Sequence, residues 1–162
     1  MGSGRARRGL IALFLTLAYT FPAFAACSDT SVELRNGPDV ARFNVEIANT
    51  DATRAKGLMN REKMAASSAM LFVYDAPRHA TFWMKNTLIP LDMIFVDSTG
   101  LVTRVHHRAE PLDETTIDGG EGVEFVLEVN GGLAKRLGIK PGSVLRHPAI
   151  EQTAAVWACG SD

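Results

Sequence analysis

The sequence predicts a mainly β domain with two short helices, folded as a compact antiparallel β-sandwich or a partly closed barrel. Apolar and polar residues alternate over about eight short segments, which are bounded by Gly, Pro, Asn and Asp. These segments do not alternate with helical patterns, which argues against a doubly wound parallel sheet. The 162 residues, 46% hydrophobic and 22% charged, suit one globular domain and exclude a disordered or fibrous chain.

The individual elements follow from local patterns. The first half of the domain is predicted to contain strands at 32–34 and 43–47, a helix at 52–56, a loop at 60–68, a strand at 70–74, a turn at 75–78 and a short aromatic strand at 81–84. The second half is predicted to contain a hairpin of 91–96 with 101–105, a long acidic surface loop at 108–122, a strand at 125–129, a helix at 131–137 and a last strand at 143–145.

The first 26 residues have the features of a secretory signal peptide. Arg5, Arg7 and Arg8 precede an apolar run at 10–19, and Ala23-Phe24-Ala25 has the small-x-small form of a cleavage site. The apolar run is too short for a membrane span, which needs about 20 residues. We therefore expect residues 27–162 to form a single globular domain that is periplasmic or secreted. Its 14 basic residues (17 less 3) against 18 acidic ones give a net charge near −4, without the basic footprint of a nucleic-acid partner.

The two cysteines lie at opposite ends of the expected mature chain. In an oxidising compartment Cys27 and Cys159 are expected to form a disulfide that joins the termini. An alternative is open, because residues 24–27 loosely resemble a lipobox. In that case Cys27 would be acylated and would tether the protein to a membrane.

The densest group of chemically versatile side chains lies at 82–92. Trp83 and Lys85 share one face of a strand by the period of two, and Asn86 follows at a turn whose partner strand resumes at Leu91. Asp92 is expected to approach Lys85 across this turn. The predicted binding residues are Arg61, Trp83, Lys85, Asn86, Asp92 and Glu110, with Arg61 and Glu110 at the rim. The alternative is a hairpin with core aromatic residues and a surface ion pair.

Several segments together resemble one family of bacterial and archaeal proteins. They are Gly57-Leu58-Met59, Met70-Leu71-Phe72-Val73, Phe82-Trp83-Met84-Lys85-Asn86-Thr87-Leu88-Ile89-Pro90-Leu91-Asp92, Ala109-Glu110-Pro111, Val126-Leu127-Glu128-Val129-Asn130 and Gly138-Ile139-Lys140-Pro141-Gly142. The family is catalogued as domain of unknown function 192 (UPF0127-like), and the resemblance covers about 40–145. It implies a compact mainly β domain and no established activity. Asn60 and Ala69 depart from the residues often found there.

Three classes of function follow from these residues. The first is a noncatalytic module that binds an unknown small molecule or peptide near Trp83, Lys85 and Asn86. The second is an enzyme in which Lys85 transfers a proton with Asp92 or Glu110. The third is copper handling, for which the candidate ligands are Met59, Met64, Met70, Met84, Met93, His106 and His107. We assign no catalytic residue, metal ligand or cofactor, because neither a nucleophile elbow nor a phosphate-binding loop occurs.

Overall fold

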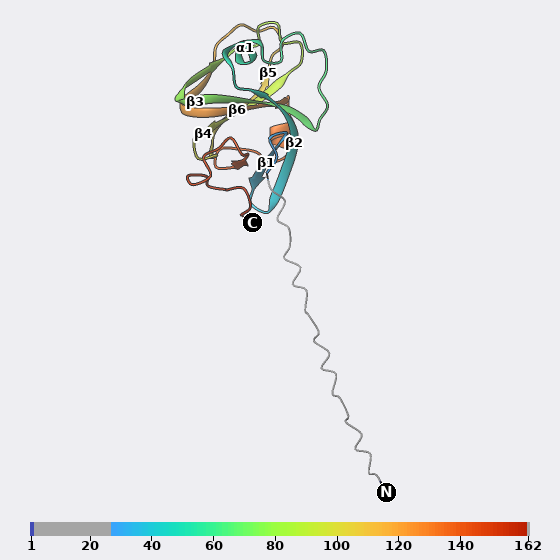
Figure 1. Cartoon of the computed structure of the whole chain (residues 1–162). Coiled ribbons are helices and arrows are strands. Elements are labelled where there is room, and N and C mark those ends of the chain that lie inside the picture. Colours follow the sequence, from blue (N-terminus) through green and yellow to red (C-terminus); the bar gives the residue numbers. More distant parts are fainter. Residues whose placement is uncertain (2–26, 162) are drawn as a thin grey trace.

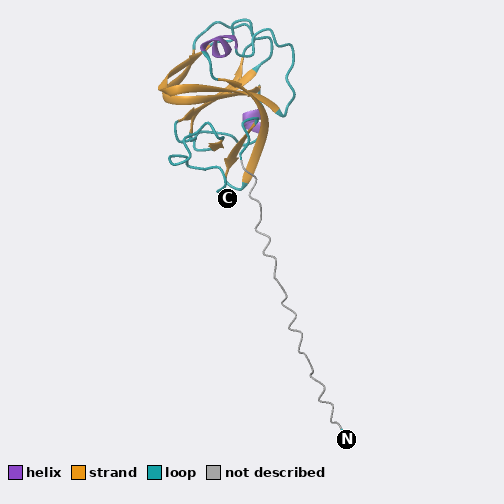
Figure 2. Ribbon diagram, in the orientation of Figure 1, coloured by secondary structure: helices purple, strands orange, loops and turns teal. Residues whose placement is uncertain are grey.

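The computed structural model describes Met1 and residues 27–161, so the predicted signal peptide lies outside the described residues. One sheet dominates the domain (Figures 1 and 2). The strands are β1 (Ser31–Asn36), β2 (Asp39–Ala48), β3 (Ser68–Phe82), β4 (Leu91–Asp97), β5 (Val102–Ala109), β6 (Ile117–Asn130) and β7 (Val144–Arg146). Two short helices, α1 (Asp51–Lys56) and α2 (Leu133–Arg136), complete the regular structure.

The sheet has the order β5-β4-β6-β3-β2-β1-β7 and curls until its two edges meet. Leu101, just before β5, forms an isolated bridge with Val144 of β7. The Val102 N–H donates to Ser143 O at 2.8 Å, and the Leu145 N–H donates to Gly100 O at 2.7 Å. All strand pairs are antiparallel except β2 with β3. The predicted mainly β, partly closed barrel is therefore confirmed.

Two strands are longer than the sequence pattern predicts. β3 has 15 residues and includes the predicted turn at 75–78, while β6 has 14 residues and begins inside the predicted loop at 108–122. Their outer halves pair with three register shifts between Val73 and Thr81. Such bulges accommodate polar residues, Gly and Pro in an exposed ribbon, so these residues were misread as turn signals.

The strand before the 83–90 loop does not form a hairpin with the strand after it. β3 ends at Phe82 and β4 begins at Leu91, but β6 lies between them and pairs with both. The predicted partnership across the Asn86 turn is therefore wrong. The predicted hairpin of 91–96 with 101–105 is confirmed as β4 and β5.

Buried apolar side chains form two clusters, one on each face of the central strands. The first lies inside the curl and includes Phe125, Leu127 and Val129 of β6. The second includes Val126 of β6 and lies on the opposite face. Its members are Ala48, Leu58, Met70, Phe72, Ala80, Met84, Ile89, Leu91, Met93, Phe95, Ala109, Val123 and Val126. Because β6 is buried on both faces, it has no solvent-exposed side over its last residues.

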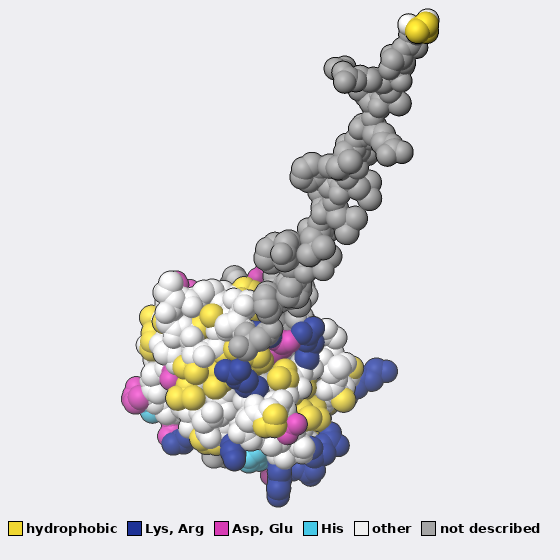
Figure 3. Space-filling model, turned by 90° about the horizontal axis from the view of Figure 1, so that it is seen from below, with side chains coloured by type: hydrophobic (Ala, Val, Ile, Leu, Met, Phe, Trp, Pro, Cys, Tyr) yellow, Lys and Arg dark blue, Asp and Glu magenta, His cyan; other side chains and the backbone are white. Residues whose placement is uncertain are grey.

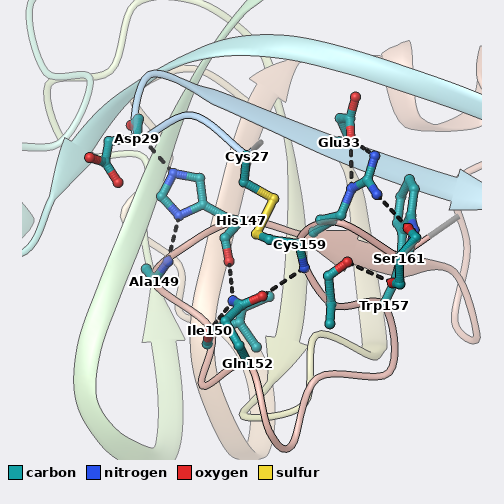
Figure 4. Close-up of a disulfide and its surroundings, with 12 residues drawn as sticks. Cys27, Asp29, Glu33, His147, Ala149, Ile150, Gln152, Trp157, Cys159 and Ser161 are labelled. Carbon is teal, nitrogen blue, oxygen red and sulfur yellow. Dashed lines mark hydrogen bonds and ion pairs between the residues drawn. A yellow bond between two sulfur atoms is a disulfide. The ribbon is translucent and has the colours of Figure 1, made fainter. Parts of the chain in front are cut away.

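A disulfide fastens the C-terminal segment to the start of β1 (Figure 4). Cys27 and Cys159 are joined with a Cα–Cα distance of 5.4 Å, which confirms the predicted bridge. Nearby, the guanidinium groups of Arg35 and Arg146 lie 4.4 and 3.9 Å from the centroid of the Trp157 ring. Figure 3 shows hydrophobic side chains among both basic and acidic ones on the lower face, so no single charge dominates it. No helix among the described residues is long and apolar enough to cross a membrane.

Candidate functional site

The candidate site begins where β3 ends. Met84 is fully buried, and its N–H donates to Asp113 O at 2.8 Å, which fixes the chain after Phe82. Trp83 therefore points outward and remains 48% exposed. The Lys85 ammonium lies 4.9 Å from the centroid of the Trp83 ring, within the range of a cation–π interaction.

The turn after Lys85 is held by backbone hydrogen bonds. Asn86 has a φ of 53°, a left-handed conformation that Asn tolerates better than most residues. Its carbonyl accepts from the Asn60 N–H at 2.7 Å, and the Thr87 carbonyl accepts from the Leu112 N–H at 3.1 Å. The first bond ties the turn to the loop after α1, which brings Met59 close to Asn86, and the second ties it to the loop after β5.

A cavity of about 190 Å³ opens beside Trp83, between α1, the loop after it and the outer face of β3 and β6. Six of its thirteen lining residues have large apolar or aromatic side chains, and five others are polar or charged. It is lined by Arg54, Ala55, Lys56, Gly57, Leu58, Met59, Phe72, Tyr74, Thr81, Phe82, Trp83, Thr87 and Glu128. Small-molecule sites combine hydrophobic and aromatic side chains with polar groups that orient the ligand, and this lining has both kinds.

The wall formed by α1 depends on a local capping arrangement. Thr50 and Thr53 exchange side-chain and backbone hydrogen bonds at the start of the helix, and Gly57 ends it with a φ of 46°. A Cβ at Gly57 would lie 3.2 Å from Cζ of Phe72. Gly57 thus allows the loop with Leu58 and Met59 to lie directly against the aromatic wall of the cavity.

Glu128 is the acidic residue of this cavity and is only 4% exposed. It pairs with Met70 of β3 on one side and with Met93 of β4 on the other, so apolar side chains flank it. Among the described residues, its carboxyl has neither a hydrogen-bond nor an ion-pair partner. Over the described part of the chain, every side-chain nitrogen or oxygen that is fully enclosed has a hydrogen-bond partner. The Glu128 oxygens have none, so they are not fully enclosed and remain accessible from the cavity. Burial raises the pKa of Glu128 to about 8, which makes it a neutral hydrogen-bond donor at neutral pH.

Glu128 is not among the binding residues that the sequence predicts. The sequence predicts a strand at 125–129, in which Phe125, Leu127 and Val129 alternate with Val126 and Glu128. The signal for a buried acid was Val126, because an apolar residue on that same side indicates a strand covered on both faces.

Basic side chains surround the cavity. Arg54 lies 5.3 Å and Arg78 lies 4.9 Å from the centroid of the Tyr74 ring. Arg54 also donates to Asn49 O, Val73 O and Asp51 Oδ1, so part of its charge is compensated. Burial raises the pKa of Tyr74, which keeps its hydroxyl neutral. Lys56 lines the cavity and is exposed, and Lys85 lies at its edge over Trp83.

Asp92 is not in this cavity and does not form an ion pair with Lys85. It is fully buried, and its carboxylate accepts from the N–H groups of Arg108, Gly132 and Ala134, each at 2.8 Å. This geometry ties the end of β5 and the start of α2 to β4. Asp92 acts as a structural acceptor in this fold.

Arg61 and Glu110 also lie apart from the cavity walls. Arg61 forms a two-point ion pair with Glu46, at 2.6 and 2.8 Å. Glu110 lines a different cavity of about 260 Å³, together with Met84, Arg104 and His106. The structure thus brings together Trp83, Lys85 and Asn86 from the predicted set, and it separates Asp92 and Glu110 from them.

Four of the five methionines considered for copper, Met64, Met70, Met84 and Met93, pack in the second apolar cluster. Met84 and Met93 are fully buried in the second apolar cluster, whereas Met59 lies on the cavity wall. Over residues 27–161 no group of three or more His, Cys, Asp and Glu side chains is arranged to hold a metal ion.

Comparison with known proteins places the chain in a family without an assigned activity. The model of the family DUF192, described as Uncharacterized ACR, matches residues 32–147. A solved protein of unknown function from Novosphingobium aromaticivorans DSM 12444 is 43% identical, with a TM-score of 0.69 over 71% of this chain and 82% of that one. A solved protein from Sinorhizobium meliloti 1021, described as a "putative transcription regulator", is 39% identical, with a TM-score of 0.70 over 75% of this chain and 95% of that one. No curated protein matches the chain. Because the family model covers most of the domain, the chain belongs to the DUF192 family.

Proposed function

We propose that this protein is an exported, noncatalytic binding module that holds a small molecule in the cavity beside Trp83. The cavity itself is the observation that carries this proposal. It has aromatic and apolar side chains in its walls, the Glu128 carboxyl inside it and the half-exposed indole of Trp83 at its mouth. An engineered apolar cavity of about 150 Å³ holds benzene, so about 190 Å³ has room for a one-ring ligand.

The geometry favours binding over the proton-transfer alternative. Catalysis by Lys85 needs an acid–base partner within hydrogen-bond reach. Asp92 is occupied by three backbone N–H groups, and Glu110 lines another cavity. The Sinorhizobium relative is described as a transcription regulator, but we propose no nucleic-acid binding for this chain. The whole chain has a net charge of −1, which does not attract a nucleic acid.

Export is supported by the disulfide and by the sequence of residues 1–26. Disulfides persist in oxidising compartments, and Cys27 uses its sulfur for the bond to Cys159. That sulfur is then unavailable for acylation. N-terminal sequencing of the exported protein is expected to begin at Ala26 or Cys27. A diacylglycerol mass on Cys27, or residues upstream of Pro22 in the exported form, would contradict the proposal.

The binding proposal is tested by mass spectrometry of small molecules that co-purify with the protein from its own periplasm. We expect one compound to be retained by the wild type and by Leu137→Ala, and lost from Trp83→Ala. Leu137 is a matched control, because it is also an exposed apolar residue on a cavity, the one lined by Asn36, Val40 and Lys135. Retention of the same compound by Trp83→Ala, or an empty wild-type protein, would contradict a ligand in this cavity.

A further inference from the structure

The cavity beside Trp83 combines a positive edge, where Lys56 also acts on the Glu46 carboxylate, with an acid that lacks a partner. Lys56 and Lys85 have no ion-pair partner among the described residues, and both lie at the cavity or its mouth. Glu128 is the one acidic side chain in the lining. A cationic ligand would meet like charges at the entrance, whereas an anionic ligand would meet complementary ones.

The buried carboxyl adds a requirement inside the cavity. In its neutral form Glu128 offers an O–H donor that no described residue accepts. A ligand that brings an acceptor oxygen or nitrogen to this position satisfies the donor, and a purely apolar ligand leaves it unpaired. Phe72, Tyr74 and Phe82 contribute aromatic side chains to the same lining.

We infer that the ligand is a small aromatic anion, an inference that rests on the proposed function. The acidic group of this ligand meets Lys56 and Lys85, and its hydrogen-bond acceptor meets the Glu128 carboxyl. The ring occupies the aromatic section of the cavity. This assignment names the chemical class of the ligand and gives Glu128 a specificity-determining role.

The inference predicts that binding depends on the protonation of Glu128. The surrounding charged and titratable groups are Arg54 and Lys56 on α1, Tyr74 on β3, and Lys85 after β3. On one side of Glu128, its partner Met70 pairs in turn with Glu46 of β2, which binds Arg61. On the other side, its partner Met93 pairs with His106 of β5. The pKa of Glu46 is lowered, chiefly by the hydrogen bond from Arg61, so Glu46 stays ionised at neutral and alkaline pH. The pKa of Tyr74 is raised by burial, so Tyr74 stays neutral there.

The experiment compares two probes with the same phenol ring and opposite charges. 4-Hydroxyphenylacetate carries a carboxylate, and tyramine carries an ammonium group. Binding is followed by the NMR signal of the Trp83 indole N–H in the full mature protein. Trp157 provides an internal control, because its indole N–H donates to Ser161 O at 3.1 Å, away from the cavity.

We expect 4-hydroxyphenylacetate to bind at about pH 6.5 and to lose about tenfold in affinity at about pH 9, one unit above the pKa of Glu128. Glu128→Gln keeps a donor without a titration, and it should abolish this loss. His106→Asn should retain the loss, which shows that the His106 side chain is not required for it. Replacing both Lys56 and Lys85 by Gln should weaken the anion and not tyramine.

The possible results separate this inference from the proposed function. Tighter binding of tyramine, or equal binding of both probes with shifts at Trp83, would overturn the anion class and leave the binding site standing. A pH dependence that persists in Glu128→Gln would overturn the role of Glu128. Absence of any shift at Trp83 with both probes, together with an empty cavity in the co-purification experiment, would overturn both proposals.

Discussion

Glu128 is a carboxylic acid between two methionines, and this position has a consequence for stability. Its pKa is about 8 in the folded protein, whereas the ordinary value is 4.5. Below pH 4.5 both the folded and the unfolded chain hold the proton. Between pH 4.5 and about 8 only the folded chain holds it, so the free energy of unfolding falls by about 1.4 kcal/mol per pH unit from this group. Above pH 8 Glu128 is ionised in both states, so its contribution to the free energy of unfolding is fully lost and no longer changes with pH.

Glu128→Gln should remove this slope, because an amide does not titrate. We expect the stability of the variant relative to the wild type to increase steadily from pH 4.5 to 8 and then to level off. Urea denaturation of both proteins across this range measures the difference, and all other titrating groups cancel in it. A difference that is constant with pH would show that Glu128 does not hold its proton in the folded state.

Asp92 and Lys85 belong to one sequence motif, but Asp92 is a buried structural residue and Lys85 lies at the surface. Asp92→Ala leaves the buried N–H groups of Gly132 and Ala134, and that of Arg108, without their acceptor. We expect a loss of about 3 kcal/mol or more in the free energy of unfolding. Lys85→Ala removes a half-buried side chain whose ammonium lies over the Trp83 ring, and it should cost at most about 1 kcal/mol.

Denaturant titration of these two variants checks the assignment. Asn86→Ala is an informative third variant, because Ala at a φ of 53° is strained while Asn86→Gly is not. The Ala variant should therefore be less stable than the Gly variant. Equal losses for Asp92→Ala and Lys85→Ala would contradict the division.

The strands that could be predicted are those in which local pattern and tertiary pairing agree. β4 and β5 have apolar runs and a Gly100 turn between them, so their hairpin follows from neighbouring residues alone. The parallel pairing of β2 with β3, and the insertion of β6 between β3 and β4, join segments far apart in the chain. No local periodicity encodes such pairing, and it is determined by burial of the whole sheet.

The candidate site divides in the same way. Trp83, Lys85 and Asn86 are contiguous, so their joint position after β3 followed from spacing. Glu128 reaches the cavity only because β6 pairs with β3, and Met59 only because the Asn60 N–H binds the Asn86 carbonyl. The hydrogen bonds of Asp92 could not be predicted, because its partners, 16 to 42 residues away, are backbone N–H groups that leave no mark on sequence composition.

β6 also depends on one close contact. A Cβ on Gly119 would lie 2.3 Å from Cε1 of Phe95 and 3.0 Å from the Ala80 carbonyl oxygen. Phe95 is fully buried and packs edge-on against Phe82, so it has little room to move. Gly119→Ala should cost about 1–3 kcal/mol through overpacking, measured by thermal or urea unfolding. Glu121→Ala, on an exposed position of the same strand, is the control and should be near neutral.

Closure of the barrel joins elements from both ends of the chain. β7 pairs with β1 and meets the start of β5, and the segment after β7 returns to the disulfide. Glu33 of β1 holds Arg42 and Arg146 by ion pairs. Burial alone would raise the pKa of Glu33, but the hydrogen bonds and charges of these two arginines outweigh it and lower the pKa. The charge of Glu33 thus strengthens the seam at neutral pH and is lost only in acid.

The disulfide should contribute most of its stabilisation through the unfolded chain. It closes a segment with a sequence separation of 132 residues, and a loop of that length corresponds to about 4–5 kcal/mol in the chain-entropy account. We expect the double variant Cys27→Ser/Cys159→Ser to fold with the same sheet and to lose about this amount in urea denaturation. The wild type under reducing conditions should match the variant. Two free thiols in the oxidised native protein, or equal stability of the oxidised and reduced forms, would contradict the role assigned to this bond.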